Sequence, residues 1–473
     1  LRCKQRSLVE LFTLFKSKHT VNKSGSRLFL IRCRVPNRWH AGQKQSSNFP
    51  RHNMEKLIIQ GGTPLIGSVE ISGSKNSSLP ILAAMLLCEG KTTVANLPHL
   101  QDVTTFLELL GSLGVELSID ENRYVEADTR TIHSLATPSE LVKKMRASIL
   151  VLGPMVSRFG EAKVSFPGGC AIGSRPVDLH IGGMESLGAE ITIENGFIKA
   201  SRRGRLRGAT ISLPFPSVGA TENIIMAASL AEGTTRIKNP ALEPEIVDFA
   251  NCLNAWGANI RGAGTPTILI EGVPKMNGGF FRVMPDRIET ATYLAAAAAT
   301  GGKVRTRHVE LSNIGSVLEK FRKTGGDLTY GTDWIEIDMQ GTRPKAVDFI
   351  TGPHPGFPTD MQAQFTVVNS VAMGISSVTE TTFETRLMQV QELRRMGAKI
   401  DLNGNVAVVT GVPKLTGARV VASDLRASAA LVIAGIAAEG ETTIDEIYHV
   451  DRGYECFEEK LHQLGAKLTR LPD

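Results

Sequence analysis

A short pattern that recurs six times constrains the fold of this chain more than any other feature. In each copy a glycine is followed by a small residue, and in most copies it is preceded by an apolar one. The six glycines are Gly114, Gly188, Gly257, Gly325, Gly397 and Gly465. They lie 74, 69, 68, 72 and 68 residues apart. Each matches a glycine that closes a helix in the left-handed conformation, and an alternating strand pattern usually follows. Six copies of a unit of roughly 70 residues predict a repeat architecture.

Each repeat also contains an earlier helix that is apolar nearly all round, as in residues 293–299 and 427–438, and such helices belong in a core. Their first turns are polar, and they open at Lys75-Asn76, Met145-Arg146, Gly219-Ala-Thr221, Asp286-Arg287, Thr359-Asp360 and Asp424-Leu-Arg426. We expect a second, more amphipathic helix to begin at an arginine in three repeats, at Arg175, Arg386 and Arg452.

One arginine at a helix start is usually an ordinary surface charge. The same placement in several repeats is different, because helix N-termini favour anions and arginine binds phosphate well. If the buried helices of a domain run parallel, their first turns meet on one face. The repeats therefore predict a cleft suited to a multiply charged phosphate ligand.

The chain has 473 residues, more than one hydrophobic core normally holds, so we expect two domains. Three repeats fit each domain, with buried helices inside and mixed sheets outside. We predict the α/β class, with residues 75–284 as the first three-repeat domain and residues 54–74 plus 285–473 as the second.

Positive charge is concentrated before Met54. Residues 1–53 hold 12 Lys or Arg and one acidic residue, Glu10, whereas the rest of the chain holds 41 Lys or Arg and 46 Asp or Glu. We interpret residues 1–53 as a basic extension outside the core, with Met54 as the expected start: upstream translated sequence, a targeting segment or a functional basic arm. The mildly acidic remainder and the 5% aromatic content argue against nucleic-acid binding.

The six cysteines are scattered, without a CxxC pair or zinc-type spacing, which favours a reducing compartment and predicts no metal site. Cys88 and Cys252 lie in apolar helices and are interpreted as core residues. The longest apolar stretches are far shorter than the roughly 20 residues that a membrane span needs. We expect a cytoplasmic protein with no membrane insertion, and no obligate protein partner is evident.

Eight motifs then occur in order over residues 54–473. They are Ser72-Gly-Ser-Lys75-Asn76, Met145-Arg146-Ala-Ser148, Pro167-Gly-Gly-Cys170-Ala-Ile-Gly-Ser-Arg175-Pro-Val-Asp178, Pro216-Ser-Val-Gly-Ala-Thr221, Pro285-Asp-Arg-Ile-Glu289, Pro358-Thr-Asp360-Met-Gln-Ala-Gln364, Asp424-Leu-Arg426-Ala-Ser428 and Asp451-Arg452-Gly-Tyr454. On these motifs the chain resembles the UDP-N-acetylglucosamine 1-carboxyvinyltransferases (UDP-N-acetylglucosamine enolpyruvyl transferases) of the EPSP synthase family. The resemblance implies two inverse α/β barrel-like domains, built here from six βαβαββ repeats, with the active site in the cleft between them.

The resemblance also implies a reaction. The enolpyruvyl group of phosphoenolpyruvate is transferred to the 3-hydroxyl of UDP-N-acetylglucosamine through a tetrahedral intermediate, and phosphate is released in the first committed step of peptidoglycan precursor synthesis. The implied catalytic residues are Cys170 as proton donor to carbon, Asp360 as the carboxylate near the sugar hydroxyl, and Lys75 and Arg452. By themselves, an aspartate at a helix start is more often an N-cap and a lone cysteine is more often an inert core residue.

The substrate-binding residues implied by the same resemblance are Lys75, Asn76, Arg146, Arg175, Pro176, Val177, Asp178, Leu179, Ser217, Val218, Gly219, Asp360, Thr382, Arg386, Asp424, Arg426 and Arg452. The nearby positive charge of Arg175 favours the thiolate of Cys170, whereas proton delivery needs the thiol. No cofactor and no metal are implied, because arginines can stabilise the charge of the phosphate. The sequence departs from the family in Phe383-Glu-Thr385-Arg386-Leu387, where many members have Phe-Glu-Asn-Arg-Phe, and at Phe215, where some have lysine.

Three alternatives stay open. Enolpyruvylshikimate-phosphate synthase shares the fold and the donor but lacks the Gly-Gly-Cys loop. A catalytically silent UDP-sugar-binding paralogue would not need to keep Cys170, Asp360 and the cations. A repeat protein used only as an interaction scaffold would not need polar residues directed at a cleft.

Overall fold

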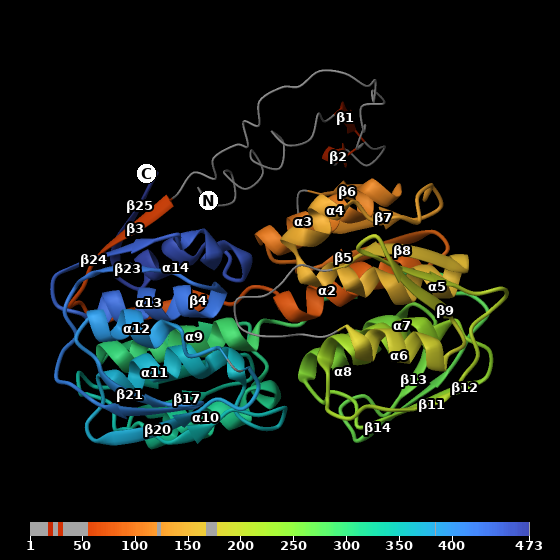
Figure 1. The fold of residues 1–473 in the computed structure, drawn as a ribbon. Helices are drawn as coiled ribbons and strands as arrows, with labels where there is room; N and C mark the ends of the chain where they lie inside the picture. The colour runs from red at the N-terminus through yellow and green to blue at the C-terminus, as the bar shows by residue number, and fades with distance from the viewer. Residues whose placement is uncertain are drawn as a thin grey trace.

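The computed structural model describes residues 18–21, 27–31, 55–120, 124–166, 177–383 and 385–472. Two lobes lie side by side in it, and each consists of helices partly enclosed by small sheets (Figure 1). Each lobe has its own hydrophobic core. The core of the first lobe runs from Leu79 to Val283, and the core of the second joins residues 57–71 to residues 288–468.

The first lobe contains α2 (Lys75–Ala84), η1 (Met85–Leu87), α3 (Gln101–Leu113), α4 (Ser139–Lys144), η2 (Arg146–Val151), α5 (Leu152–Phe159), α6 (Asp178–Ser186), α7 (Val218–Ser229) and α8 (Pro244–Ala255). Its strands are β5 (Lys91–Ala95), β6 (Glu116–Ile119), β7 (Val125–Asp128), β8 (Glu161–Ser165), β9 (Glu190–Glu194), β10 (Phe197–Ser201), β11 (Thr210–Ser212), β12 (Thr234–Lys238), β13 (Asn259–Arg261), β14 (Thr267–Glu271) and β15 (Phe280–Arg282).

The second lobe contains α9 (Arg287–Thr300), η3 (Leu311–Asn313), α10 (Gly315–Lys323), η4 (Thr359–Met361), α11 (Gln362–Ser370), α12 (Gln389–Arg395), α13 (Leu425–Ala437), η5 (Ile447–Arg452) and α14 (Phe457–Gln463). Its strands are β3 (Glu55–Gln60), β4 (Ile66–Glu70), β16 (Lys303–Arg307), β17 (Asp327–Tyr330), β18 (Trp334–Asp338), β19 (Phe349–Ile350), β20 (Ile375–Thr379), β21 (Lys399–Asn403), β22 (Val406–Thr410), β23 (Arg419–Val421), β24 (Glu441–Asp445) and β25 (Lys467–Pro472).

Three helices form the centre of each lobe: α2, α7 and α5 with η2 in the first, and α9, α11 and α13 in the second. The central helices are rich in small and aliphatic residues and can therefore be buried on all sides. In α9 every residue from Ile288 to Ala299 is buried, and in α13 the same holds from Arg426 to Ile436. This confirms the expectation that the apolar helices lie in a core.

One strand arrangement recurs in five sheets. A parallel pair is followed by two antiparallel pairs in the orders β15-β5-β7-β6, β11-β12-β14-β13, β4-β16-β18-β17, β19-β20-β22-β21 and β23-β24-β3-β25. A further sheet has the order β8-β10-β9. The α/β class is therefore confirmed, while the finer description as two barrel-like domains of six βαβαββ repeats stays a prediction that this recurrence supports.

All six predicted glycines have the left-handed backbone, with φ between 88° at Gly397 and 106° at Gly257, and a strand follows each. The prediction that an amphipathic helix begins at Arg386 and another at Arg452 is wrong. The amphipathic helices α12 and α14 begin at Gln389 and Phe457, not at Arg386 and Arg452. Arg386 lies in a turn before α12, and Arg452 ends the 3-10 helix η5 before Gly453.

The chain crosses between the lobes twice, and the two crossing segments lie against each other. Gly73 pairs antiparallel with Pro285, the backbone N–H of Ser74 donates to Met284, and that of Asp286 donates to Ser72. A Cβ at Gly73 would lie 1.7 Å from the carbonyl oxygen of Asn96, so only glycine fits there. The junction between the lobes is thus a close pair of hydrogen-bonded segments.

Two short strands belong to the basic extension: β1 (Lys18–Val21) and β2 (Arg27–Ile31), and β2 pairs with β6 at the edge of a first-lobe sheet. We predicted that residues 1–53 form an extension outside the core, and the pairing of β2 with β6 was not part of that prediction. Cys88 and Cys252 are buried and free, as expected. In the described part of the chain, every helix is too short or too polar to cross a membrane.

Candidate active site

The first turns of the central helices are fixed by short polar side chains at their N-caps. Asp286 accepts hydrogen bonds from the first-turn N–H groups of α9, and Asp424 does the same for α13. Ser74 and Ser217 cap α2 and α7. Since such side chains are the preferred N-caps, the sequence itself determines where these helices begin and therefore where the neighbouring cations stand.

Lys75 and Arg452 meet on a shared carboxylate. The amine of Lys75 lies 2.8 Å from Oδ2 of Asp102, and Nε of Arg452 donates to Oδ1 of the same carboxylate at 3.0 Å. Asp102 is 6% exposed and Lys75 is 12% exposed, whereas Arg452 is 37% exposed. Lys75 and Asp102 belong to the first lobe and Arg452 to the second, so this cluster joins the lobes.

The cluster perturbs the protonation of its members. Burial would raise the pKa of Asp102, but the charges of Lys75 and Arg452 outweigh burial and lower it. Burial lowers the pKa of Lys75; Asp102 opposes this effect, while Arg452 and Arg426 add to it. Lys75 is therefore a cation whose charge depends on the carboxylate beside it.

A second cluster surrounds Asp360 in the second lobe. Nη2 of Arg386 donates to Oδ1 of Asp360 at 2.7 Å, and Nη2 of Arg426 donates to Oδ2 at 2.9 Å. The side chains of Arg386 and Arg426 are 6% and 3% exposed. Asp360 makes no helix-capping hydrogen bond, so the alternative interpretation of this residue as an N-cap is wrong.

This arrangement favours the charged carboxylate form of Asp360. Burial would raise its pKa, but Arg426 and Arg386 outweigh burial and hold the pKa well below its ordinary value. Nε and Nη1 of Arg426 are buried and have no hydrogen bond of ordinary geometry within the described residues, although the ring of Tyr454 lies beside the guanidinium, 5.4 Å from ring centroid to Cζ. Guanidinium donors without an acceptor are suited to an anionic ligand.

Further contacts join the lobes near these clusters. Nε of Arg287 donates to Oε1 of Glu245 at 2.9 Å, with both side chains at or below 10% exposure. Oδ2 of Asp286 accepts the backbone N–H of Lys75 at 3.1 Å, and Oε1 of Glu243 accepts that of His354 at 3.3 Å. Asp102, Glu243 and Glu245 lie outside the eight motifs, so no sequence pattern indicated these acids.

The remaining predicted residues occupy helix starts of the first lobe. Arg146 is the first residue of η2, Asp178 and Leu179 are the first two of α6, and Val177 precedes them. Ser217, Val218 and Gly219 form the cap and first turn of α7, and Asn76 follows Lys75 in α2. Backbone N–H groups at these starts can donate hydrogen bonds to a diphosphate.

Two residues that lie next to these helix starts were missed. His180 is buried and bonded through Nδ1 to Asn223 at 3.0 Å, and a Cβ at Gly219 would lie 3.2 Å from its ring. Burial, followed by the charge of Arg146, lowers the pKa of His180 to about 4, so its imidazole is neutral near pH 7. The signal in the sequence was its position two residues after Asp178.

Cys170, Arg175 and Pro176 lie outside the described residues, so the cysteine loop stays a prediction. Thr382 is exposed, and its backbone N–H donates to Glu380 at 2.7 Å. Asp424 caps α13, and its Oδ1 accepts the backbone N–H of Arg426 at 2.9 Å. The predicted residues that the structure describes thus fall into the two clusters, helix starts of both lobes and the loop before Arg386.

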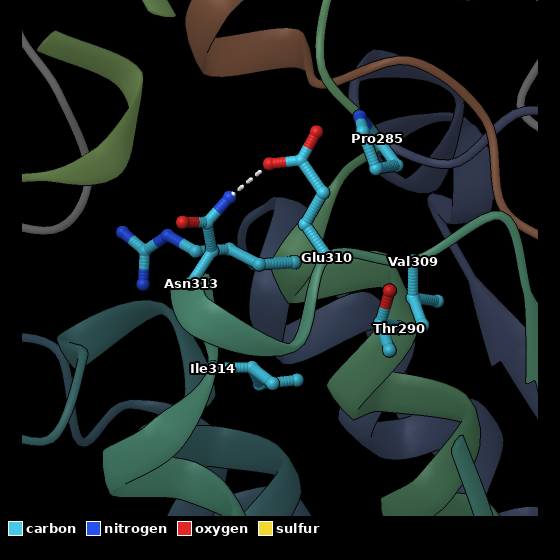
Figure 2. Close-up of a pocket in the computed structure, with 7 residues that line it drawn as sticks. Pro285, Thr290, Val309, Glu310, Asn313 and Ile314 are labelled. Atoms are coloured by element: carbon cyan, nitrogen blue, oxygen red, sulfur yellow. Dashed lines mark hydrogen bonds between the residues drawn. The ribbon is translucent and has the colours of Figure 1, made fainter. Parts of the chain in front are cut away.

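Figure 2 shows a pocket at the start of α9, lined by Pro285, Arg287, Thr290, Val309, Glu310, Asn313 and Ile314. Its polar groups already have partners. Arg287 bonds Glu245, and Nδ2 of Asn313 donates to Glu310 at 2.7 Å. The pocket therefore offers no set of unused groups that would select a ligand. Across the described ranges there is also no cluster of three His, Cys, Asp or Glu side chains arranged to hold a metal ion.

Two α/β lobes of this form are the fold of solved enolpyruvyl transferases. The enolpyruvyl transferase NikO from Streptomyces tendae superposes with a TM-score of 0.80 at 24% identity, covering 89% of this chain and 99% of that one. An EPSP synthase from Acinetobacter baumannii superposes with a TM-score of 0.70 at 20% identity, covering 88% of this chain and 100% of that one. The chain belongs to the EPSP synthase (3-phosphoshikimate 1-carboxyvinyltransferase) family, whose model matches residues 59–461. Enzymes of this family transfer the enolpyruvyl group of phosphoenolpyruvate.

Proposed function

We propose that this protein is a cytoplasmic UDP-N-acetylglucosamine 1-carboxyvinyltransferase that supplies a peptidoglycan precursor. The observation that carries the proposal is the pairing of two charge clusters: Lys75 and Arg452 on one carboxylate, and Asp360 between two arginines. The clusters are close enough that the charge of Arg426 lowers the pKa of Lys75. Lys75 and Arg452, the cations proposed to bind phosphoenolpyruvate, thus lie near Asp360, the carboxylate proposed to contact the sugar hydroxyl.

In the addition step, the oxygen of the sugar 3-hydroxyl bonds to C2 of phosphoenolpyruvate. The hydroxyl proton passes to a carboxylate, for which Asp360 is the candidate, and C3 takes a proton from the thiol of Cys170. In the elimination step, C3 of the tetrahedral intermediate returns a proton to the thiolate of Cys170 as the C2–O bond to phosphate breaks, and the proton held by the carboxylate passes to the leaving phosphate. Lys75, Arg175 and Arg452 hold the phosphate throughout, and their charges stabilise the leaving group.

The low pKa of Asp360 limits how it can act. A carboxylate held by two arginines is a weak base, and a good general base has a pKa near the working pH. We infer that Asp360 orients the hydroxyl by accepting its hydrogen bond, and gains basicity when Arg386 or Arg426 turns toward bound substrate. The unused donors of Arg426 support this step, because a ligand anion offers them an acceptor.

The acceptor assignment rests on the motifs. We assign Asn76, Thr382 and Asp424 to the sugar side, and Arg146, Arg175 to Leu179 and Ser217 to Gly219 to the uracil and diphosphate. The helix start at Val218, with its cap Ser217 and the neutral His180 beside it, provides backbone donors for a diphosphate. The Gly-Gly-Cys170 loop distinguishes this acceptor class from shikimate 3-phosphate.

A second candidate is 3-phosphoshikimate 1-carboxyvinyltransferase, which the description of the family model favours. Phosphate release from phosphoenolpyruvate, measured with UDP-N-acetylglucosamine and with shikimate 3-phosphate in parallel, distinguishes the two. We expect release with the nucleotide sugar only. Release with shikimate 3-phosphate only would establish the second candidate, and release with neither would favour a silent paralogue.

A further inference from the structure

The carboxylate of Asp102 contacts both Lys75 and Arg452. Its Oδ2 lies 2.8 Å from the amine of Lys75 and 3.4 Å from Nη2 of Arg452, while its Oδ1 accepts Nε of Arg452 at 3.0 Å. It is the second residue of α3 and is packed against the first-lobe core. Because this buried carboxylate pairs with both cations, it constrains the positions of both side chains.

The two cations come from different parts of the molecule. Lys75 opens α2 directly after the chain enters the first lobe, and its backbone N–H is held by Asp286 of the second lobe. Arg452 lies in η5 of the second lobe, 350 residues from Asp102 in the sequence. The contact of Arg452 with Asp102 therefore exists only when the lobes are together.

The charges explain why a carboxylate is needed there. Two cations this close repel each other, and Arg452 and Arg426 both lower the pKa of Lys75. Asp102 offsets that repulsion but leaves an excess of positive charge for an anion. A neutral residue in its place would leave Lys75 less protonated and would remove the ion pair between Arg452 and Asp102.

We propose that Asp102 is a positioning residue for phosphoenolpyruvate, because its carboxylate aligns Lys75 and Arg452 for the phosphate when the lobes close. This inference rests on the proposed function of the site, in which these two cations bind the donor. Asp102 itself does not contact the reacting atoms. Through Asp102, binding of phosphoenolpyruvate depends on contact between the two lobes.

The test is direct titration of phosphoenolpyruvate into the full chain by calorimetry, for wild type, Asp102→Asn and the matched control Glu245→Gln. The control removes another buried charge pair across the lobes, Glu245–Arg287, without touching Lys75 or Arg452. We expect Asp102→Asn to weaken phosphoenolpyruvate binding by about tenfold or more, as loss of one partner of a buried charge pair does. Glu245→Gln should weaken it by no more than about threefold.

The pH dependence supplies a second readout, which a purely structural role would not change. Since Asp102 raises the pKa of Lys75 against the effect of burial, Asp102→Asn should lose phosphoenolpyruvate affinity at a lower pH than wild type, and Glu245→Gln should not. Asp102→Glu keeps the charge but moves it by one methylene. It should therefore weaken binding less than Asn does and keep the wild-type pH profile.

Equal phosphoenolpyruvate affinities for wild type and Asp102→Asn would overturn the inference. A loss of affinity in Glu245→Gln as large as that in Asp102→Asn would also overturn it, because Asp102 would then act only as a contact between the lobes. If Asp102→Asn does not fold, unchanged affinity in Asp102→Glu together with a shifted pH profile overturns it. The outcomes separate from those of the proposed function, because titration needs no acceptor. If wild type binds phosphoenolpyruvate but does not react with UDP-N-acetylglucosamine, only the proposed acceptor is refuted. If wild type does not bind phosphoenolpyruvate, both the proposed function and the role of Asp102 are refuted.

Discussion

Replacing Asp360 with asparagine should destabilise the second lobe and slow the reaction. The substitution keeps the shape of the side chain but removes the charge shared by Arg386 and Arg426, which are 6% and 3% exposed. Removing one partner of a buried ion pair costs about 3–5 kcal/mol, because the remaining charge is left uncompensated. Asparagine keeps one oxygen that can accept one of the two hydrogen bonds, so we expect a loss near the lower end, about 3 kcal/mol.

The assay is urea unfolding at pH 7 and at a series of lower pH values. The pKa of Asp360 is depressed in the folded protein, so its charge contributes stability above the unfolded-state pKa of about 3.9. That stability is lost as the pH falls toward the folded-state pKa. The difference between wild type and Asp360→Asn should therefore be constant at neutral pH and shrink only below about pH 4.

A matched surface control is Asp338→Asn, which removes an ion pair with Lys303, a side chain that is 50% exposed. It should change the stability little, because exposed pairs are solvated. A stability of Asp360→Asn equal to that of the control variant would refute the argument that Asp360 neutralises two buried arginines. Turnover measured on the same sample should fall by roughly 10²-fold or more, the range for loss of a proton-transfer group.

Other substitutions test the remaining features. Cys170→Ala should abolish turnover yet bind the UDP-sugar as wild type does, and undiminished turnover would remove this thiol from the mechanism. Lys75→Met should raise the KM for phosphoenolpyruvate by about tenfold or more while leaving affinity for the UDP-sugar within a few-fold, and equal effects on both substrates would contradict its assignment to the donor. Asn223→Ala removes buried hydrogen bonds to one backbone N–H and one carbonyl, so urea unfolding should show a loss of about 2–4 kcal/mol. Gly73→Ala should fail to yield soluble protein, whereas Gly182→Ala, with nothing within 4 Å of the new Cβ in a helix, should raise stability by about 0.5–1 kcal/mol.

The sequence predicted local structure well, because helix caps and helix ends depend on nearby residues. The glycine closing each repeat and the capping residues Asp286 and Asp424 have local causes, and each is where the pattern placed it. The domain boundaries stay a prediction, which the two separate cores support. The starts of α12 and α14 were wrong because an arginine that precedes a helix resembles one that opens it.

The candidate site was predictable only in part, since its contacts join distant repeats. Motif matching selected Asp360, Arg386 and Arg426, and the structure brings these three together. Asp102 lies in the first turn of α3, the second helix of its repeat, and an acid there does not fit the pattern of cations from which the anion site was predicted. No periodicity can show that an acid in the first repeat bonds an arginine in the sixth.

The position of β3 has a consequence for synthesis of the chain. This strand lies between β24 and β25, with Gln60 opposite both Glu441 and Lys467, although it precedes the whole first lobe in the sequence. On a ribosome the first-lobe core can form as soon as Val283 has emerged, whereas β3 stays unpaired until the last strands appear. Nascent chains held on the ribosome should accordingly protect the first lobe from protease early, and the edge of β3 is the surface that a chaperone would have to cover in the meantime.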